Sequence, residues 1–154
     1  GNFVNFLIAA VAVYCLLFYV YPYLKRLLRG RDVIYIEPKA LEEQMAQKKD
    51  MLLIDIRSPS EFYNMFGHID GAINLPFAEF MIRINETADR LAGFKEIPVV
   101  IIGLRDENSV FKAYRILKQK GFSDVSILNY GISRWLRQGL PTVAPITVSG
   151  VLSS

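Results

Sequence analysis

Few side chains in this 154-residue sequence could act as nucleophiles, bases or metal ligands. The chain has one cysteine, Cys15, and one histidine, His68. A single cysteine cannot form an internal disulfide, and a lone histidine leaves no Cys/His spacing suited to a structural zinc ion. The sequence therefore predicts no metal site, and nothing in it points to a cofactor.

Ser109 and the polar residues before it are the other candidates for chemistry. No histidine or lysine base can be placed beside Ser109 from the sequence, and a role as the N-cap of a following helix accounts for this serine. Asp106, Glu107 and Asn108 supply fewer oxygen ligands than a bound calcium ion needs. We expect residues 106–108 to form a solvated loop.

Cys15 lies inside an apolar segment at the start of the sequence. Residues 6–21 contain no charged side chain, and with their neighbours they supply about 20 residues, enough to cross about 30 Å of hydrocarbon. The uncharged start and the bulky far end differ from a cleaved signal peptide. A buried core helix is the remaining alternative. We expect residues 1–24 to be a single transmembrane anchor, which would hold Cys15 within the membrane.

Four basic residues follow the apolar segment directly: Lys25, Arg26, Arg29 and Arg31. The positive-inside bias therefore predicts that the rest of the chain lies in the cytoplasm. Without these four, the 18 basic residues of the chain fall to 14, against 15 acidic ones. The remaining domain is near neutral, which argues against a nucleic-acid partner.

After this flank, short apolar runs alternate with stretches of helical pattern. The expected strands are residues 33–36, 51–54, 73–75, 99–102 and 125–128. The expected helices are residues 38–48, a helix that begins at the capping box Ser58–Glu61, and residues 78–92, 109–119 and 132–138. Such alternation, with short loops, predicts an α/β fold with a mostly parallel sheet.

The sequence also predicts where the chain divides. Residues 25–32 are expected to be a basic juxtamembrane linker between the anchor and the α/β domain, which spans residues 33–144. The small and polar residues 145–154 are expected to be a disordered tail.

Two blocks of this domain form a recognisable pattern. The first contains Asp55-Ile56-Arg57 at a strand end, Glu61-Phe62 in a capped helix, and the run from Gly67 to Pro76. The second runs from Gly121-Phe122 through Trp135 to Gly139-Leu140-Pro141. Together they resemble the rhodanese-like superfamily over residues 33–143. The resemblance implies a three-layer domain with a mostly parallel central sheet and flanking helices. One membrane helix ahead of one such domain also resembles a bacterial inner-membrane type.

The resemblance implies a particular chemistry and a departure from it. The family uses a cysteine at the end of the central strand, whose thiolate forms a persulfide inside a ring of backbone amides. The matching strand is residues 99–102, and the residue in the cysteine's place is Gly103. No persulfide can form there, and Asp106 and Glu107 disfavour an anion in the loop. We therefore expect no catalytic residue and no enzyme activity.

The resemblance also implies structural roles for four residues. Asp55 and Arg57 are expected to hold loops by hydrogen bonds, His68 to be a hydrogen-bonded turn residue, and Trp135 to pack in the core or at its edge.

These observations leave three functions open. The first is a non-catalytic interaction module that binds another protein, for example a membrane protein. Its binding surface is either the membrane helix or the loop Gly103, Leu104, Arg105, Asp106, Glu107, Asn108 and Ser109. The second is an enzyme, either a sulfurtransferase or sulfur carrier that uses a partner's cysteine, or a hydrolase whose catalytic residue the sequence does not reveal. The third is a sensor of small anions or metabolites, which the two acidic side chains of the loop disfavour for anions. The sequence favours the first, with the membrane and another protein as partners.

Overall fold

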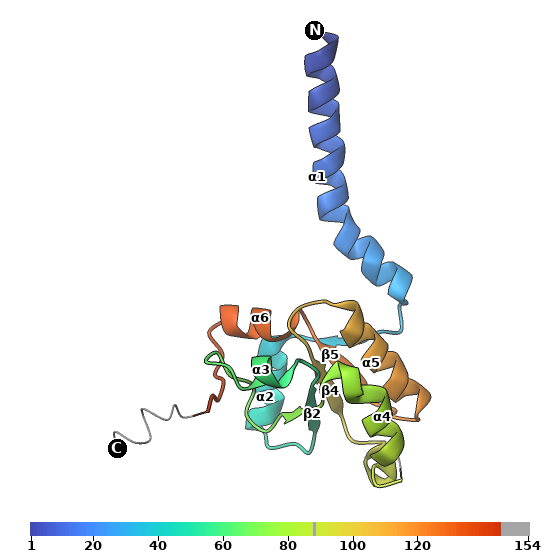
Figure 1. Ribbon diagram of the computed structural model, residues 1–154, viewed down its shortest axis with the longest axis vertical. Helices are drawn as coiled ribbons and strands as arrows, with labels where there is room; N and C mark the ends of the chain where they lie inside the picture. The colour runs from blue at the N-terminus through green and yellow to red at the C-terminus, as the bar shows by residue number, and fades with distance from the viewer. Residues whose placement is uncertain (88, 146–154) are drawn as a thin grey trace, which may run out of the picture. The chain divides into compact units, whose positions relative to one another are not determined.

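The computed structural model describes residues 1–87 and 89–145 (Figure 1). The chain divides into two units, and the boundary in the sequence follows Val33. The tail expected at residues 145–154 lies outside the described residues except for Pro145.

The first unit contains one long helix, α1 (Asn2–Arg29), of 28 residues. At 1.5 Å per residue it is about 42 Å long. Within the described residues, it is the one helix long and apolar enough to cross a membrane by length and composition. The helix continues through Lys25 and Arg26 to Arg29, so the basic residues expected in a linker lie largely on the helix itself. It ends at Gly30, which has a φ of 117°, a backbone conformation that glycine adopts readily and other residues rarely do.

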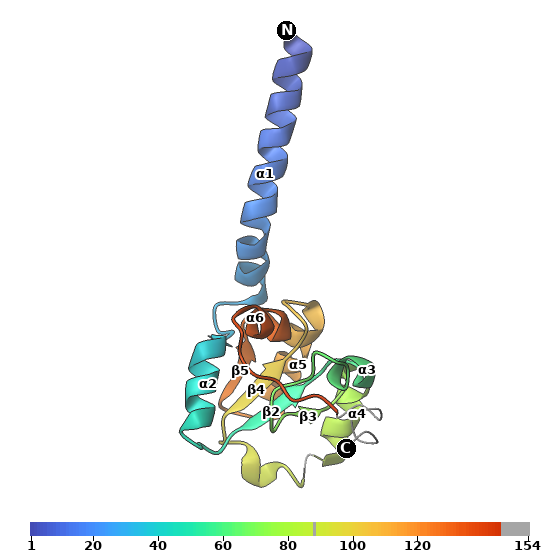
Figure 2. The same ribbon diagram turned by 90° about the vertical axis from the view of Figure 1, so that its left-hand side faces the viewer.

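The second unit is built on a five-stranded sheet in which every pairing is parallel (Figure 2). The strands are β1 (Tyr35–Ile36), β2 (Leu52–Asp55), β3 (Ile73–Asn74), β4 (Val99–Ile102) and β5 (Val125–Leu128), in the spatial order β1-β5-β4-β2-β3. All four residues of β4 are buried, as a central strand covered on both faces requires. The predicted α/β fold with a mostly parallel sheet is confirmed.

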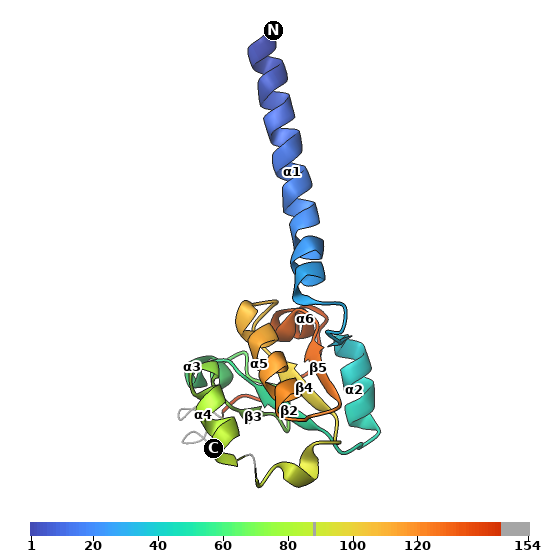
Figure 3. The same cartoon turned by 90° about the vertical axis from the view of Figure 1, so that its right-hand side faces the viewer.

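Helices cover both faces of the sheet. They are α2 (Pro38–Ala46), α3 (Pro59–Phe62), α4 (Phe77–Thr87), the 3-10 helix η1 (Ala92–Phe94), α5 (Asn108–Gln119) and α6 (Gly131–Arg137). Figures 1 and 3 show α4 and α5 on one side of the sheet, with α2 on the other. The helix expected over residues 78–92 ends at Thr87 and is followed by the separate η1.

Two predictions about helix starts have different outcomes. Ser58 caps α3, since its Oγ accepts a hydrogen bond from the Glu61 amide at 3.3 Å and donates one to Glu61 Oε1 at 3.0 Å. The prediction that Ser109 is an N-cap was wrong. The N-cap of α5 is Glu107, and Ser109 lies in the first turn.

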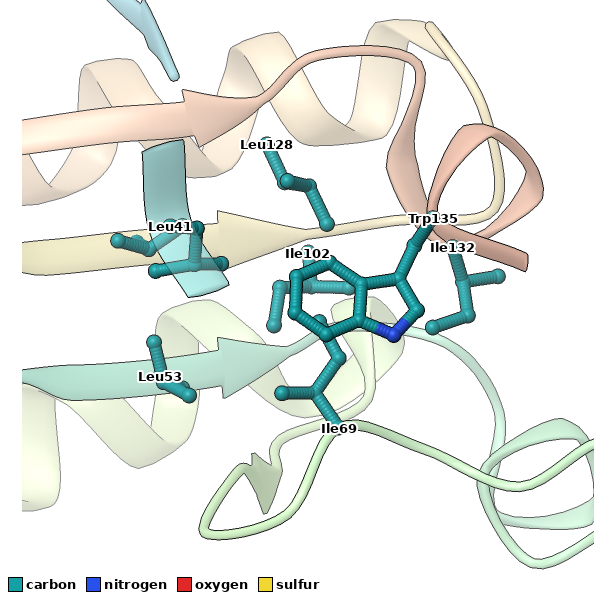
Figure 4. Packing of buried hydrophobic residues seen from close by; sticks show 8 residues of the cluster. Leu41, Leu53, Ile69, Ile102, Leu128, Ile132 and Trp135 are labelled. Carbon is teal, nitrogen blue, oxygen red and sulfur yellow. The ribbon is translucent and has the colours of Figure 1, made fainter. Parts of the chain in front are cut away.

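The core on the α2 and α6 side of the sheet surrounds Trp135 (Figure 4). Its buried members come from the strands, from both helices and from one loop: Leu41, Leu53, Ile69, Val100, Ile102, Leu128, Ile132 and Trp135. Trp135 is 1% exposed, and its indole Nε1 donates a hydrogen bond to the carbonyl of Pro141 at 2.9 Å. This core fixes α6 against the carboxyl-terminal half of the sheet.

The strand order reverses its direction between β2 and β4. After β2 the chain moves outward to β3, and after β4 it moves to β5 on the other side. Asp55 pairs with Ile102 at the carboxyl ends of these two strands. In open parallel sheets, ligands bind beyond the carboxyl ends of the strands at such a switch point. The fold therefore directs attention to the loops that follow Asp55 and Ile102.

Replacing Trp135 by alanine should lower the free energy of unfolding by about 3–5 kcal/mol, because it removes a large buried side chain. The measurement is urea-dependent pulse proteolysis of the full chain in detergent micelles. Ile82→Ala is the control, since Ile82 is 62% exposed and its loss should change stability by about 0.5 kcal/mol or less. Equal losses for the two variants would contradict the assigned core.

Candidate functional site

A cavity of about 260 Å³ lies at the switch point between β2 and β4. One side is lined by residues that follow β2: Ile56, Arg57, Ser58 and Glu61. The other side is lined by residues that follow β4: Gly103, Leu104, Glu107 and Ser109. Four of the seven loop residues proposed from the sequence therefore line one cavity with residues that are distant in the chain.

Gly103, the first residue after β4, has no room for a side chain. A Cβ atom built on Gly103 would overlap Val110 Cγ2 and would lie 2.8 Å from Glu107 Oε2. Val110 is buried in the first turns of α5 and is 1% exposed. The space beside Gly103 is thus filled by an apolar side chain and a carboxylate.

Glu107 folds its side chain back into the loop. Its Oε1 atom accepts a hydrogen bond from the backbone amide of Arg105 at 2.7 Å. The Arg105 side chain instead reaches α6, where its Nε lies 3.4 Å from Ser133 Oγ. The backbone amide of Arg105 is therefore already occupied by the carboxylate of Glu107.

The start of α6 holds the same loop from the other side (Figure 3). The amides of Ile132 and Ser133 donate hydrogen bonds to the carbonyls of Gly103 and Leu104, at 2.9 and 3.0 Å. This approach needs a glycine at residue 131, since a Cβ there would lie 2.7 Å from the carbonyl carbon of Leu104. Gly131 also has a φ of 57°. The start of α6 therefore holds the loop backbone at Gly103 and Leu104.

Asp55 and Arg57 form a buried ion pair under the cavity. Arg57 Nη2 lies 2.9 Å from Asp55 Oδ2, Nε lies 3.0 Å from Oδ1, and the two side chains are 4% and 0% exposed. Arg57 Nη2 also donates to the carbonyl of Gly67 at 3.1 Å. The predicted role in holding loops matches these contacts, because the pair joins the end of β2 to the segment that begins at Gly67.

His68 does not line the cavity. Its Nδ1 lies 2.8 Å from the carbonyl of Phe62, its ring stacks on that of Phe62 with centroids 3.6 Å apart, and its backbone pairs with Val143. Trp135 also lies elsewhere, in the core described above. The His68 and Trp135 side chains therefore contact other residues of the domain and do not line the cavity.

The lining offers hydroxyl and carboxylate groups and no thiol or imidazole. Ser58 and Ser109 supply the hydroxyls, and Glu61 and Glu107 the carboxylates. Among the residues that the structure describes, no group of three or more histidine, cysteine, aspartate or glutamate side chains could hold a metal ion. The arrangement can bind a polar group, and it lacks the usual nucleophile–base pair.

Sequence reasoning missed the β2 side of this cavity. Ser58 and Glu61 were recognised only as a helix cap, and the contact between Gly131 and the loop had no sequence signal. Parallel strands present their carboxyl ends at one edge of the sheet, but only the observed pairing of β2 with β4 brings Ser58 and Glu61 beside Gly103.

Comparison with known proteins supports one family. A family model of the rhodanese-like domain matches residues 37–138. The chain is 36% identical over 110 residues to a sulfurtransferase of Allochromatium vinosum, covering 71% of this chain and 94% of that protein. It is 32% identical over 96 residues to the chloroplastic thiosulfate sulfurtransferase 16 of Arabidopsis thaliana, covering 59% and 78%. A rhodanese-related protein of Thermoplasma volcanium has a similar structure, with a TM-score of 0.58, 25% identity, and coverage of 73% and 99%.

Asp55→Ala should lower the free energy of unfolding by about 3–5 kcal/mol, because it leaves the buried Arg57 charge uncompensated. The double change of Asp55 to Ala and Arg57 to Met should cost less than Asp55→Ala alone. Denaturant titration of the full chain measures both. The exposed pair Glu79–Arg83 provides the control, and Glu79→Ala should cost about 0.5 kcal/mol or less. A double variant less stable than the single one would contradict this account of the pair.

Gly103→Ala should destabilise the protein by about 1–3 kcal/mol, because the new methyl group overpacks against Val110. The same change should cost less in a chain that already carries Val110→Ala, because the smaller side chain at residue 110 leaves room for the methyl group. Thermal unfolding of the wild type, the two single variants and the double variant gives the coupling energy between residues 103 and 110. Gly93→Ala is a matched control, since a Cβ at Gly93 meets nothing within 4 Å. Additive effects at residues 103 and 110 would contradict the packing described here.

Proposed function

The chain belongs to the rhodanese-like domain family, and we propose that it is a catalytically inactive member that acts as a protein-interaction module. In this proposal, residues 1–24 anchor the chain in a plasma membrane of the bacterial inner-membrane type. Residues 25–32 connect the anchor to the domain at residues 33–144, which lies on the cytoplasmic face.

The observation that carries the proposal is the filled space at Gly103. The family resemblance assigns a cysteine to this position, at the end of the central strand. Here Val110 and Glu107 take up the space in which a side chain would lie. The one cysteine of the sequence, Cys15, is part of α1. A persulfide intermediate at the loop therefore has no sulfur atom on which to form.

The loop itself is suited to recognition by another protein. The start of α6 holds its backbone at Gly103 and Leu104, and Leu104 is 40% exposed. The loop also borders a second, more open depression of about 580 Å³, lined by Phe66, Arg105, Ser133, Leu136 and Arg137. Protein interfaces combine an apolar core with a polar rim, and the surface around this loop offers both kinds of residue. We propose residues 103–109 as the centre of this surface, with Asp55, Arg57, His68 and Trp135 in structural roles.

The proposed anchor would favour such a role. A domain held at a membrane meets other membrane-bound proteins at an effective concentration raised by the tether, without any new contact. Lys25, Arg26, Arg29 and Arg31 favour the cytoplasmic orientation by the positive-inside rule. The proposed partner is accordingly a protein at the same membrane.

A second candidate function is sulfur transfer with a cysteine supplied by a partner. It is favoured by the relatives named sulfurtransferase, at 36% and 32% identity. In that case the partner's thiol would enter the cavity beside Gly103. The carboxylates of Glu61 and Glu107 oppose this candidate, because they disfavour a thiolate near them.

Photo-crosslinking in native membranes tests the proposed module. A photoreactive residue at Leu104 should capture a defined partner, and one at Phe94 should not. Both positions are exposed, at 40% and 48%, but Phe94 lies before β4 begins, at the opposite end of the strand. The change of Asp106 and Glu107 to alanine should reduce capture at Leu104 about fivefold or more, on the scale of one charged contact.

Equal capture at Leu104 and Phe94, or none at Leu104, would contradict a role for the loop. A captured partner whose reactive cysteine is required for the crosslinked complex to form would favour the second candidate instead.

A further inference from the structure

The cavity at the switch point contains two carboxylates that come from opposite sides. Glu61 follows β2 and Glu107 follows β4. Each uses one oxygen in a local hydrogen bond, Glu61 Oε1 with Ser58 Oγ and Glu107 Oε1 with the Arg105 amide. Within residues 1–87 and 89–145, neither forms an ion pair with a lysine or arginine. Two acidic groups of the described residues therefore line one cavity, and neither is paired with a lysine or arginine of the chain.

The arginines close to the cavity do not cancel this charge. Arg57 lines the cavity, but its guanidinium is held by Asp55 in a buried, bidentate pair. Arg105 belongs to the same loop as Glu107, but its side chain is directed to Ser133 on α6. The lining therefore has a net negative charge at the place where the fold positions a ligand.

We propose that this cavity binds one basic side chain, lysine or arginine, of the partner protein. The inference rests on the interaction module proposed above and names the chemistry of its recognition. The second carboxylate oxygens of Glu61 and Glu107, with the hydroxyls of Ser58 and Ser109, provide acceptors for an ammonium or guanidinium group.

The shape of the cavity agrees with a side chain as its occupant. At about 260 Å³ it is slightly smaller than the usual range for small-molecule sites, about 300–1,000 Å³. Ile56 and Leu104 give it an apolar part, where the alkyl stem of a lysine or arginine can pack. Leu104 is partly exposed, so the cavity opens beside the surface on which the partner is proposed to lie.

Peptide selection tests the inference without knowledge of the partner. The full-length chain, in nanodiscs of zwitterionic phosphatidylcholine, is used to select from a random heptapeptide library. The neutral lipid surface keeps basic peptides from binding to the membrane itself. Peptides enriched on the wild-type chain should carry lysine or arginine at one fixed position.

Three variants assign the effect to the cavity. Glu61→Gln and Glu107→Gln each remove a charge but keep a side-chain oxygen for the hydrogen bonds of Ser58 and Arg105. Each should weaken the selected peptides about tenfold, the scale of one hydrogen bond to a charged group. Glu43→Gln is the matched control, on the exposed surface of α2, and should leave binding unchanged. Replacement of the basic residue by acetyl-lysine should weaken binding to a similar extent.

Each other outcome overturns the inference. Enrichment of acidic or neutral peptides, or a basic preference that survives both glutamine variants, would show that the cavity does not select a cation. No enrichment at all would also contradict it, because a site for a single side chain should retain short peptides. The crosslinking result at Leu104 separates the two proposals. If a partner is captured at Leu104 but the selected peptides show no preference for a basic residue, the proposed interaction module stands and only the proposed basic ligand is rejected.

Discussion

Val110 and Glu107 fill the space that a side chain at residue 103 would need, and the form of the site depends on that packing. Val110 is buried with α5, so it cannot move aside without disturbing the contact of this helix with the sheet. The Glu107 carboxylate accepts a hydrogen bond from the Arg105 amide, and Glu107 lines the cavity. The same packing therefore leaves no room for a side chain at residue 103, and it positions one of the two carboxylates that line the cavity.

The rest of the domain supports this arrangement from three directions. The parallel pairing of β2 and β4 brings the loops after Asp55 and Ile102 together at one edge of the sheet. The Asp55–Arg57 pair joins the first of these loops to Gly67, and the amides of α6 fix the second through Gly103 and Leu104. A loop fixed in this way pays little ordering entropy when it binds, which favours recognition by a surface that is already formed.

The sequence predicted the sheet well, but of the cavity at the switch point it pointed only to the side that follows β4. The strands β4 and β5 occupy the predicted residues, because runs such as Val99–Ile102 are long, apolar and β-branched. The end of the helix after β3 was predicted less well, since no glycine or proline marks the boundary at Thr87. Gly103 was recognised as the central residue from the family pattern. The contribution of Glu61 was not, because it depends on which strands are neighbours, and periodicity carries no information about strand order.

The measurement that tests this account most directly is sulfur transfer by the full-length chain alone. The chain and its Cys15→Ser variant would be placed in nanodiscs with thiosulfate and cyanide, and thiocyanate formation followed over time. The protein of Allochromatium vinosum named sulfurtransferase would serve as the comparison enzyme. We expect thiocyanate to form at the rate of buffer alone with both chains, because Gly103 leaves the loop without a thiol. Turnover by the wild-type chain, whether or not Cys15→Ser removes it, would contradict the proposal that this member of the family is catalytically inactive.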